Sequence, residues 1–103
     1  MPTQYTAKLT PKQRAYLKSL ANSITHRYLL GKTEIDEGFL VNVDKALEAK
    51  ELIKVGLLQN CALTPKEVAE ELEKKLRAQT VQIIGRVIVL YRRSQKNPQI
   101  EVG

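Results

Sequence analysis

The sequence predicts an α+β domain with a four-stranded mixed sheet and helices packed on one face. Three stretches have apolar residues at helical spacing, beginning near residues 10, 36 and 64. Four short apolar runs lie between and after them, at 26–30, 52–58, 81–84 and 87–91, and these predict strands. The resulting order is α-β-α-β-α-β-β, which suits one mixed sheet whose second face is partly apolar and open.

The starts of the helices are marked by capping residues. Thr10 is followed by Pro11 and Gln13, which is a capping box with proline at the first helical position. Thr64-Pro65-Lys66-Glu67 repeats the device for the third helix, and Asp36 is a good N-cap for a second helix that ends near Lys50. On the second helix we expect a plain solvated acidic face, made of Glu37, Asp44, Glu48 and Glu51.

The strands are identified by alternation and by a turn. In residues 52–58, Ile53, Val55 and Leu57 alternate with a less covered set, so the first set should face the helices. Gly85-Arg86 forms a tight turn between the last two strands. Tyr91 alternates with Val87 and Val89, which predicts burial in the core rather than stacking on a base.

One domain is expected in 103 residues, with an N-terminal tail at 1–8, the folded domain at 9–93 and a loose tail at 94–103. No apolar run approaches the ~20 residues of a membrane span, and no signal-peptide core is present, so we expect a cytoplasmic protein. We also expect a monomer. The single cysteine, Cys61, has no internal partner for a disulfide.

The net charge of +6 is unevenly distributed along the chain. Residues 1–33 contain six basic and no acidic residues, residues 34–73 have a net charge of −6, and residues 74–103 have a net charge of +6. If the two ends of the chain meet in space, they form a basic face opposite an acidic one. Such a face attracts phosphate polymers, although a generically basic soluble domain would have the same composition.

The sequence contains no recognisable catalytic constellation. His26 is the only histidine, so a histidine triad or metal pair is excluded, and Cys61 has no neighbouring cysteine or basic residue to activate it. Gly31-Lys32-Thr33 looks like the end of a phosphate-binding loop, but the upstream glycine of that motif is replaced by His26. We therefore expect neither an enzyme nor a cofactor.

The turn at 31–34 is the strongest candidate for ligand binding. It joins a strand to the start of a helix, where free amides and the helix dipole favour an anion. Gly31 permits close approach of another backbone, and Lys32 adds a positive charge. An ordinary strand-to-helix turn is the alternative explanation.

Several segments of the chain together resemble a known family. They are Leu9-Thr10-x-Lys12-Gln13, Leu30-Gly31-Lys32, Glu37-Gly38, Ala46-Leu47-Glu48-x-x-Glu51-Leu52-Ile53-Lys54-Val55, Leu58-Gln59-Asn60 and Val81-Gln82-x-Ile84-Gly85-x-x-x-Val89-Leu90-Tyr91-Arg92. Their order and spacing resemble the small bacterial YhbY/YqeI-type proteins, which are stand-alone CRM domains. The resemblance covers about residues 9–102. It implies an RNA-binding module associated with the precursor of the large ribosomal subunit, with a fold similar to the C-terminal domain of translation initiation factor three.

The chain departs from that family at one position. The family turn is Gly-x-x-Gly, likened to the loop with which KH domains clamp nucleotide backbone. Here Gly31 and Lys32 match, but Glu34 replaces the second glycine. Glu34 could point away from the RNA, weaken the clamp, or mark its loss.

The sequence therefore predicts a non-enzymatic protein that binds structured ribosomal RNA during assembly of the 50S subunit. The partner would be large-subunit ribosomal RNA or its precursor in a pre-50S particle. The alternatives are a protein adaptor that uses the acidic helix or the open sheet face, and a double-stranded DNA binder. The predicted RNA contacts are Lys12, Arg14, Lys18, Arg27, Gly31, Lys32, Thr33, Arg86, Arg92 and Arg93.

Overall fold

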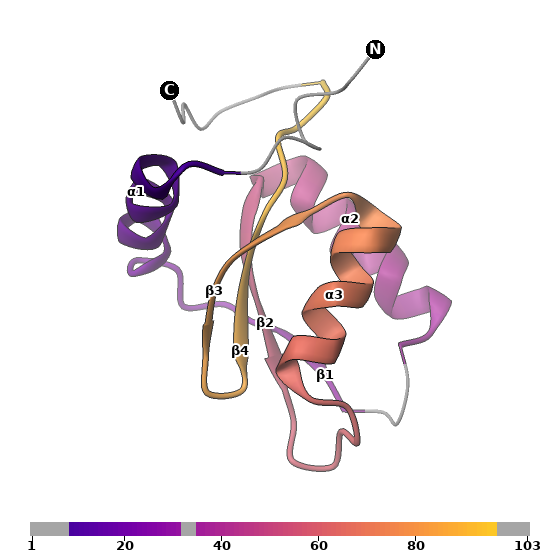
Figure 1. The fold of residues 1–103 in the computed structure, drawn as a ribbon. Coiled ribbons are helices and arrows are strands. Elements are labelled where there is room, and N and C mark those ends of the chain that lie inside the picture. Colours follow the sequence, from indigo (N-terminus) through magenta and orange to yellow (C-terminus); the bar gives the residue numbers. More distant parts are fainter. Residues whose placement is uncertain (1–8, 32–34, 97–103) are drawn as a thin grey trace.

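A computed structural model describes residues 9–31 and 35–96 (Figure 1). The element order is the predicted one, and the four strands form one sheet in the order β1-β2-β4-β3. β1 pairs with β2 in parallel, whereas β2–β4 and β3–β4 are antiparallel, so the sheet is mixed. The elements are α1 (Pro11–Ala21), β1 (Tyr28–Leu30), α2 (Glu37–Lys50), β2 (Leu52–Leu57), α3 (Pro65–Leu76), β3 (Gln79–Ile84) and β4 (Val87–Tyr91).

The capping residues begin the helices as predicted. At α1, the Thr10 hydroxyl accepts a hydrogen bond from the Gln13 amide, and the Gln13 side chain accepts one from the Thr10 amide. α3 has the same reciprocal pair at Thr64 and Glu67. These bonds satisfy amides that have no partner within the helix, so the local sequence fixes where each helix starts.

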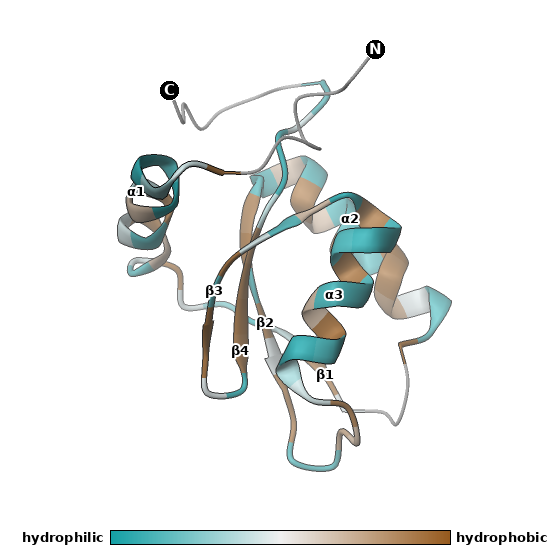
Figure 2. Cartoon of the chain, viewed as in Figure 1, coloured by the Kyte–Doolittle hydropathy of each residue, from teal (hydrophilic) through white to brown (hydrophobic). Residues whose placement is uncertain are grey.

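The helices lie on both faces of the sheet, and the expectation that all of them share one face is wrong. One apolar cluster joins α2 and α3 to alternate residues of the central strands, among them Ile53, Val55 and Ile88. The intervening residues, including Leu52 and Val89, pack instead against α1. Figures 1 and 2 show α1 on the opposite side of the strands from α3, with apolar residues along the strands between them. Both faces are apolar because α1 covers part of the second one.

The acidic face of α2 is not the plain solvated surface expected from the sequence. Glu51 is fully buried, and its carboxylate accepts a hydrogen bond from the Ser94 amide. Glu48 accepts bonds from the Ser94 hydroxyl and from the Gln95 and Lys96 amides. Residues 94–96 are therefore held by hydrogen bonds to Glu48 on α2 and to Glu51 at its end. The rest of the expected C-terminal tail lies outside the described residues.

Candidate nucleic-acid interface

The acidic residues lie on one side of the sheet, with α2 and α3, and the side that α1 covers has none among the described residues. Within residues 9–31 and 35–96, every aspartate and glutamate lies on α2, on α3 or at their capping positions Asp36 and Glu51. α1 and all four strands contain no acidic residue. Because α1 contacts β3 and β4, the basic N-terminal segment meets the C-terminal strands, which is the condition set above for a basic face.

We call the exposed surface of α1, together with the open sheet surface on its side, the acid-free face. The strand register assigns its members, because paired residues point to the same side of a sheet. Lys54 pairs with Val89, which packs against α1, so Lys54 lies on this face. One row further from α1, Leu29, Gly56, Val87 and Ile84 lie side by side across the four strands.

Arg27 is placed on the same face by contact with Gly56. A Cβ atom at Gly56 would lie 3.1 Å from Leu29 Cδ2 and 3.5 Å from Arg27 Cδ, so both side chains cross the sheet directly above this glycine. Arg27 is exposed, and Leu29 is 56% exposed. The acid-free face thus combines apolar and cationic groups. Its exposed or half-buried residues include Lys12, Lys18, Arg27, Leu29, Lys54 and Ile84.

Gly31 and Arg86 lie at one end of the sheet, next to Leu58. A Cβ atom at Gly31 would lie 2.8 Å from Leu58 Cδ1, so the absence of a side chain lets Leu58, just after β2, pack against Gly31. Arg86 donates from Nη2 to the Leu58 carbonyl at 2.7 Å and from Nε to the Leu57 carbonyl at 3.1 Å. The structure therefore brings these two predicted site residues to the same place.

The remainder of the predicted clamp is only partly described. Lys32, Thr33 and Glu34 lie outside the described residues. At the start of α2, the Asp36 carboxylate accepts a hydrogen bond from the Phe39 amide at 2.8 Å. The Phe39 amide at the start of α2 is therefore already paired. The Asp36 carboxylate also lies at the helix N-terminus, where the sequence suggested that a phosphate would bind.

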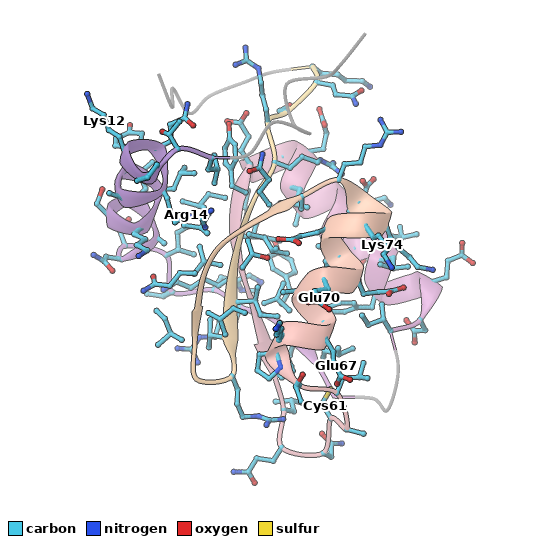
Figure 3. The ribbon with its side chains drawn as sticks, in the orientation of Figure 1. Lys12, Arg14, Cys61, Glu67, Glu70 and Lys74 are labelled. Atoms are coloured by element: carbon cyan, nitrogen blue, oxygen red, sulfur yellow. The ribbon has the colours of Figure 1, made fainter. Side chains whose placement is uncertain are left out.

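Arg14, like Arg86, donates hydrogen bonds to backbone carbonyls within the protein. Arg14 points from α1 toward β3, whereas Lys12 points away from the sheet (Figure 3). Nη1 of Arg14 donates to the Thr80 and Val81 carbonyls at 2.6 and 3.0 Å. These two bonds join α1 to the sheet through Nη1 of the Arg14 guanidinium. Any contact of Arg14 with RNA therefore has to use the other nitrogens of the same group.

Arg92 and Arg93 differ in their surroundings. The Arg92 side chain is only 10% exposed and pairs with Asp44 at 2.7 Å, while it also donates to the Leu76 carbonyl at 3.0 Å. It lies on the α2–α3 side, away from the acid-free face. Arg93 is exposed. Binding of RNA by either arginine stays a prediction.

α3 carries its basic residues among acidic ones. Lys75 lies 3.4 Å from Glu71, one turn earlier. Figure 3 shows Glu70 and Lys74 on the same helix. The Glu73 carboxylate accepts a hydrogen bond from the Thr80 amide. α3 is thus less suited to binding an anionic polymer.

Lys54 is the cation that the sequence-based site omitted. The alternation of residues along β2 placed Lys54 on the less covered side of the sheet, and this pattern would have been enough to include Lys54 among the predicted RNA contacts.

No group of three or more potential metal ligands occurs within residues 9–31 and 35–96, and Cys61 is buried. In the same ranges, no helix has the length and apolarity that a membrane span requires.

Comparison with known proteins places this arrangement in a family. The model of the CRS1/YhbY (CRM) domain matches residues 9–92, nearly the whole described chain. The chain belongs to the CRM domain family. YqeI of Bacillus subtilis (strain 168), named a probable RNA-binding protein, is 46% identical over 94 residues, which cover 91% of this chain and 98% of YqeI.

Two further relatives agree with this assignment. A Haemophilus influenzae protein named RNA-binding protein is 34% identical, with 85% of this chain and 89% of that protein covered. The solution structure of a hypothetical Staphylococcus aureus protein has a TM-score of 0.75 and 46% identity over 91% of this chain and 98% of that one. The α+β fold predicted from the sequence is therefore confirmed for this CRM domain.

Proposed function

We propose that this CRM domain is a non-enzymatic protein that binds structured ribosomal RNA through its acid-free face during assembly of the 50S subunit. The observation that carries the proposal is the segregation of charge by the sheet, with acids on α2 and α3 and uncompensated cations on the other side. The names of the relatives as RNA-binding proteins support the choice of polymer. The ribosomal target follows from the family resemblance.

The expected mode of recognition is contact with the RNA backbone. Lys12, Lys18 and Arg27 are exposed on the acid-free face, and Lys54 is half-buried there. Lysine and arginine contacts to phosphates position a protein on RNA without reading its sequence. Lys32 and Thr33 stay predicted contacts from the sequence, and Arg86 lies at the same end of the sheet as Gly31.

The test is the salt dependence of binding to a fragment of precursor large-subunit RNA. If about five phosphate contacts release counterions, log K should fall with log salt at a slope of roughly −3.5 to −4.5. Reversing two charges in Lys18→Glu/Lys54→Glu should weaken binding and flatten the slope by roughly 1.5 to 2. A wild-type slope near −1 would contradict the proposal.

The matched control reverses two lysines in the acid-containing layer. Lys45 on α2 and Lys66 on α3 are both exposed, so Lys45→Glu/Lys66→Glu changes the net charge by the same amount. The proposal requires a smaller loss of affinity in this control. Equal losses in both double variants would show that only net charge matters. Competition between RNA and DNA duplexes at matched salt excludes a DNA binder if the RNA duplex is preferred.

A protein adaptor is the second candidate, and exposed apolar side chains favour it. Leu29 and Ile84 are 56% and 55% exposed on the acid-free face. A partner protein could cover them, with Arg27 and Lys54 meeting its acidic residues. In that case Leu29→Ser should abolish binding to pre-50S particles while binding to naked RNA stays unchanged.

A further inference from the structure

A pocket of about 450 Å³ opens beside the edge strand β1, between the end of α1 and the end of α2. This volume lies within the range of about 300–1,000 Å³ that is typical of small-molecule sites. Ile24, Leu52 and Ile53 give it an apolar lining, and the last two are buried. None of its lining residues is acidic.

Two aromatic rings and a cation form the rim of the pocket. The rings of His26 and Tyr28 meet edge to face, with centroids 4.7 Å apart and planes at 86°. Lys50 Nζ lies 5.9 Å from the centre of the Tyr28 ring. His26 is exposed, whereas Tyr28 is half-buried against the α2–α3 cluster. Tyr28 therefore supports the exposed His26 ring, whose position is constrained by this contact.

We propose that this pocket binds one unpaired nucleobase of the RNA. The inference rests on the proposed function and identifies the part of the RNA that the protein reads. Sequence-specific RNA recognition uses unpaired bases that stack on histidine, tyrosine or phenylalanine rings, with apolar surface around them. His26 and Tyr28 supply the rings, and Ile24 with Leu52 supplies the apolar surface.

The charges around the pocket fit the phosphates on either side of the base. Lys50 lies on the rim, and Arg27, next to His26 in the chain, lies on the acid-free face. A strand leaving the pocket past Arg27 would reach that face directly, so the pocket and the phosphate-binding surface would hold one continuous RNA. An apolar peptide would fill the pocket without needing either cation, and this complementarity of charge favours the nucleotide.

The experiment compares two RNA probes with the same stem. The first is a hairpin with an unpaired oligouridine loop, and the second is a fully paired duplex of equal length and charge. His26→Ala should weaken binding to the hairpin by roughly 5- to 150-fold, the effect of losing one stacked base, and leave duplex binding unchanged. His26→Phe keeps a stacking ring and should retain hairpin affinity within about twofold. Lys50→Ala should weaken hairpin binding more than its matched control on the same helix, Lys45→Ala.

The outcomes separate this inference from the proposed function. If the wild type binds both probes and His26→Ala binds the hairpin as tightly as the wild type does, the pocket does not hold a base and the inference is overturned, while RNA binding stands. If the wild type binds neither probe with measurable salt dependence, both proposals fail. Intermolecular NMR contacts between uridine base protons and the His26 ring would support the inference directly, and their absence in a saturated complex would contradict it.

Discussion

Arg92 Nη1 lies 2.7 Å from the Asp44 carboxylate, and the pair joins the end of β4 to the middle of α2. Nη2 of the same guanidinium donates to the Asp44 carbonyl, and Nη1 donates to the Leu76 carbonyl at the end of α3. One arginine therefore links three elements. This set of bonds gives Arg92 a structural role whether or not RNA also contacts it.

Replacing Arg92 should destabilise the fold. Asp44 is half exposed, so the ion pair by itself contributes little, at most about 1 kcal/mol. Arg92→Ala also removes the hydrogen bonds to the Asp44 and Leu76 carbonyls, and together we expect a loss of about 1–3 kcal/mol in the free energy of unfolding. Arg93→Ala, at an exposed neighbouring position, should stay within about 0.5 kcal/mol. Denaturant unfolding measures both, and equal stabilities would contradict the structural role of Arg92.

Acid should release the segment that follows Arg92. The hydrogen bond from the Ser94 hydroxyl, those from the Lys96 and Gln95 amides, and the charge of Arg92 hold the pKa of Glu48 below its usual value. Since the folded state lowers this pKa, the contribution of Glu48 is complete above the ordinary glutamate value, about 4.3. It is lost as the pH falls through the lowered pKa. NMR amide shifts of Ser94, Gln95 and Lys96 should therefore titrate together in this acidic range.

Glu48→Gln is the control for that titration. The side-chain carbonyl oxygen of glutamine can still accept hydrogen bonds, but the amide carries no charge that titrates. The shared transition of the three amides should disappear in this variant. If it persists with the same midpoint, another group controls the segment and the role assigned to Glu48 is wrong.

Gly31 is expected to serve packing as well as any RNA contact. The added methyl group of Gly31→Ala would meet Leu58 Cδ1 at 2.8 Å and Asn60 Oδ1 at 3.3 Å. Because the end of the Leu58 side chain is partly exposed and can shift, the cost should be modest, about 1 kcal/mol. In a double-mutant cycle, Leu58→Ala should recover part of this loss. Additive effects of the two substitutions on stability would contradict the contact.

Local signals in the sequence predicted most of the fold. Thr10, Asp36 and Thr64 start helices because their oxygens accept bonds from amides within the next turn, and this depends only on near neighbours. The side of the sheet that α1 covers was predicted wrongly. That choice depends on an apolar cluster that brings together Leu17, Leu52 and Val89, which belong to segments far apart in the chain.

The candidate site was harder to predict for the same reason. Charge counting found the basic ends of the chain, but it treated Arg14 and Arg92 as free cations, although carbonyls and a carboxylate from distant segments surround them. The acids of α2 looked solvated because the residues that cover Glu48 and Glu51 come more than 40 positions later. Lys54 was visible from alternation alone, whereas the pocket beside His26 required the two helix ends to be placed together.

The most direct test of the acid-free face is an NMR titration of the isotope-labelled protein with the precursor RNA fragment. The account predicts that the amides perturbed by RNA belong to α1, to the segment around Arg27, and to Lys54 and Ile84 on the open sheet. Amides on the outer surface of α3, such as those of Lys66 and Glu70, should stay unchanged. Perturbations confined to α2 and α3, with α1 and Lys54 unaffected, would contradict the central claim.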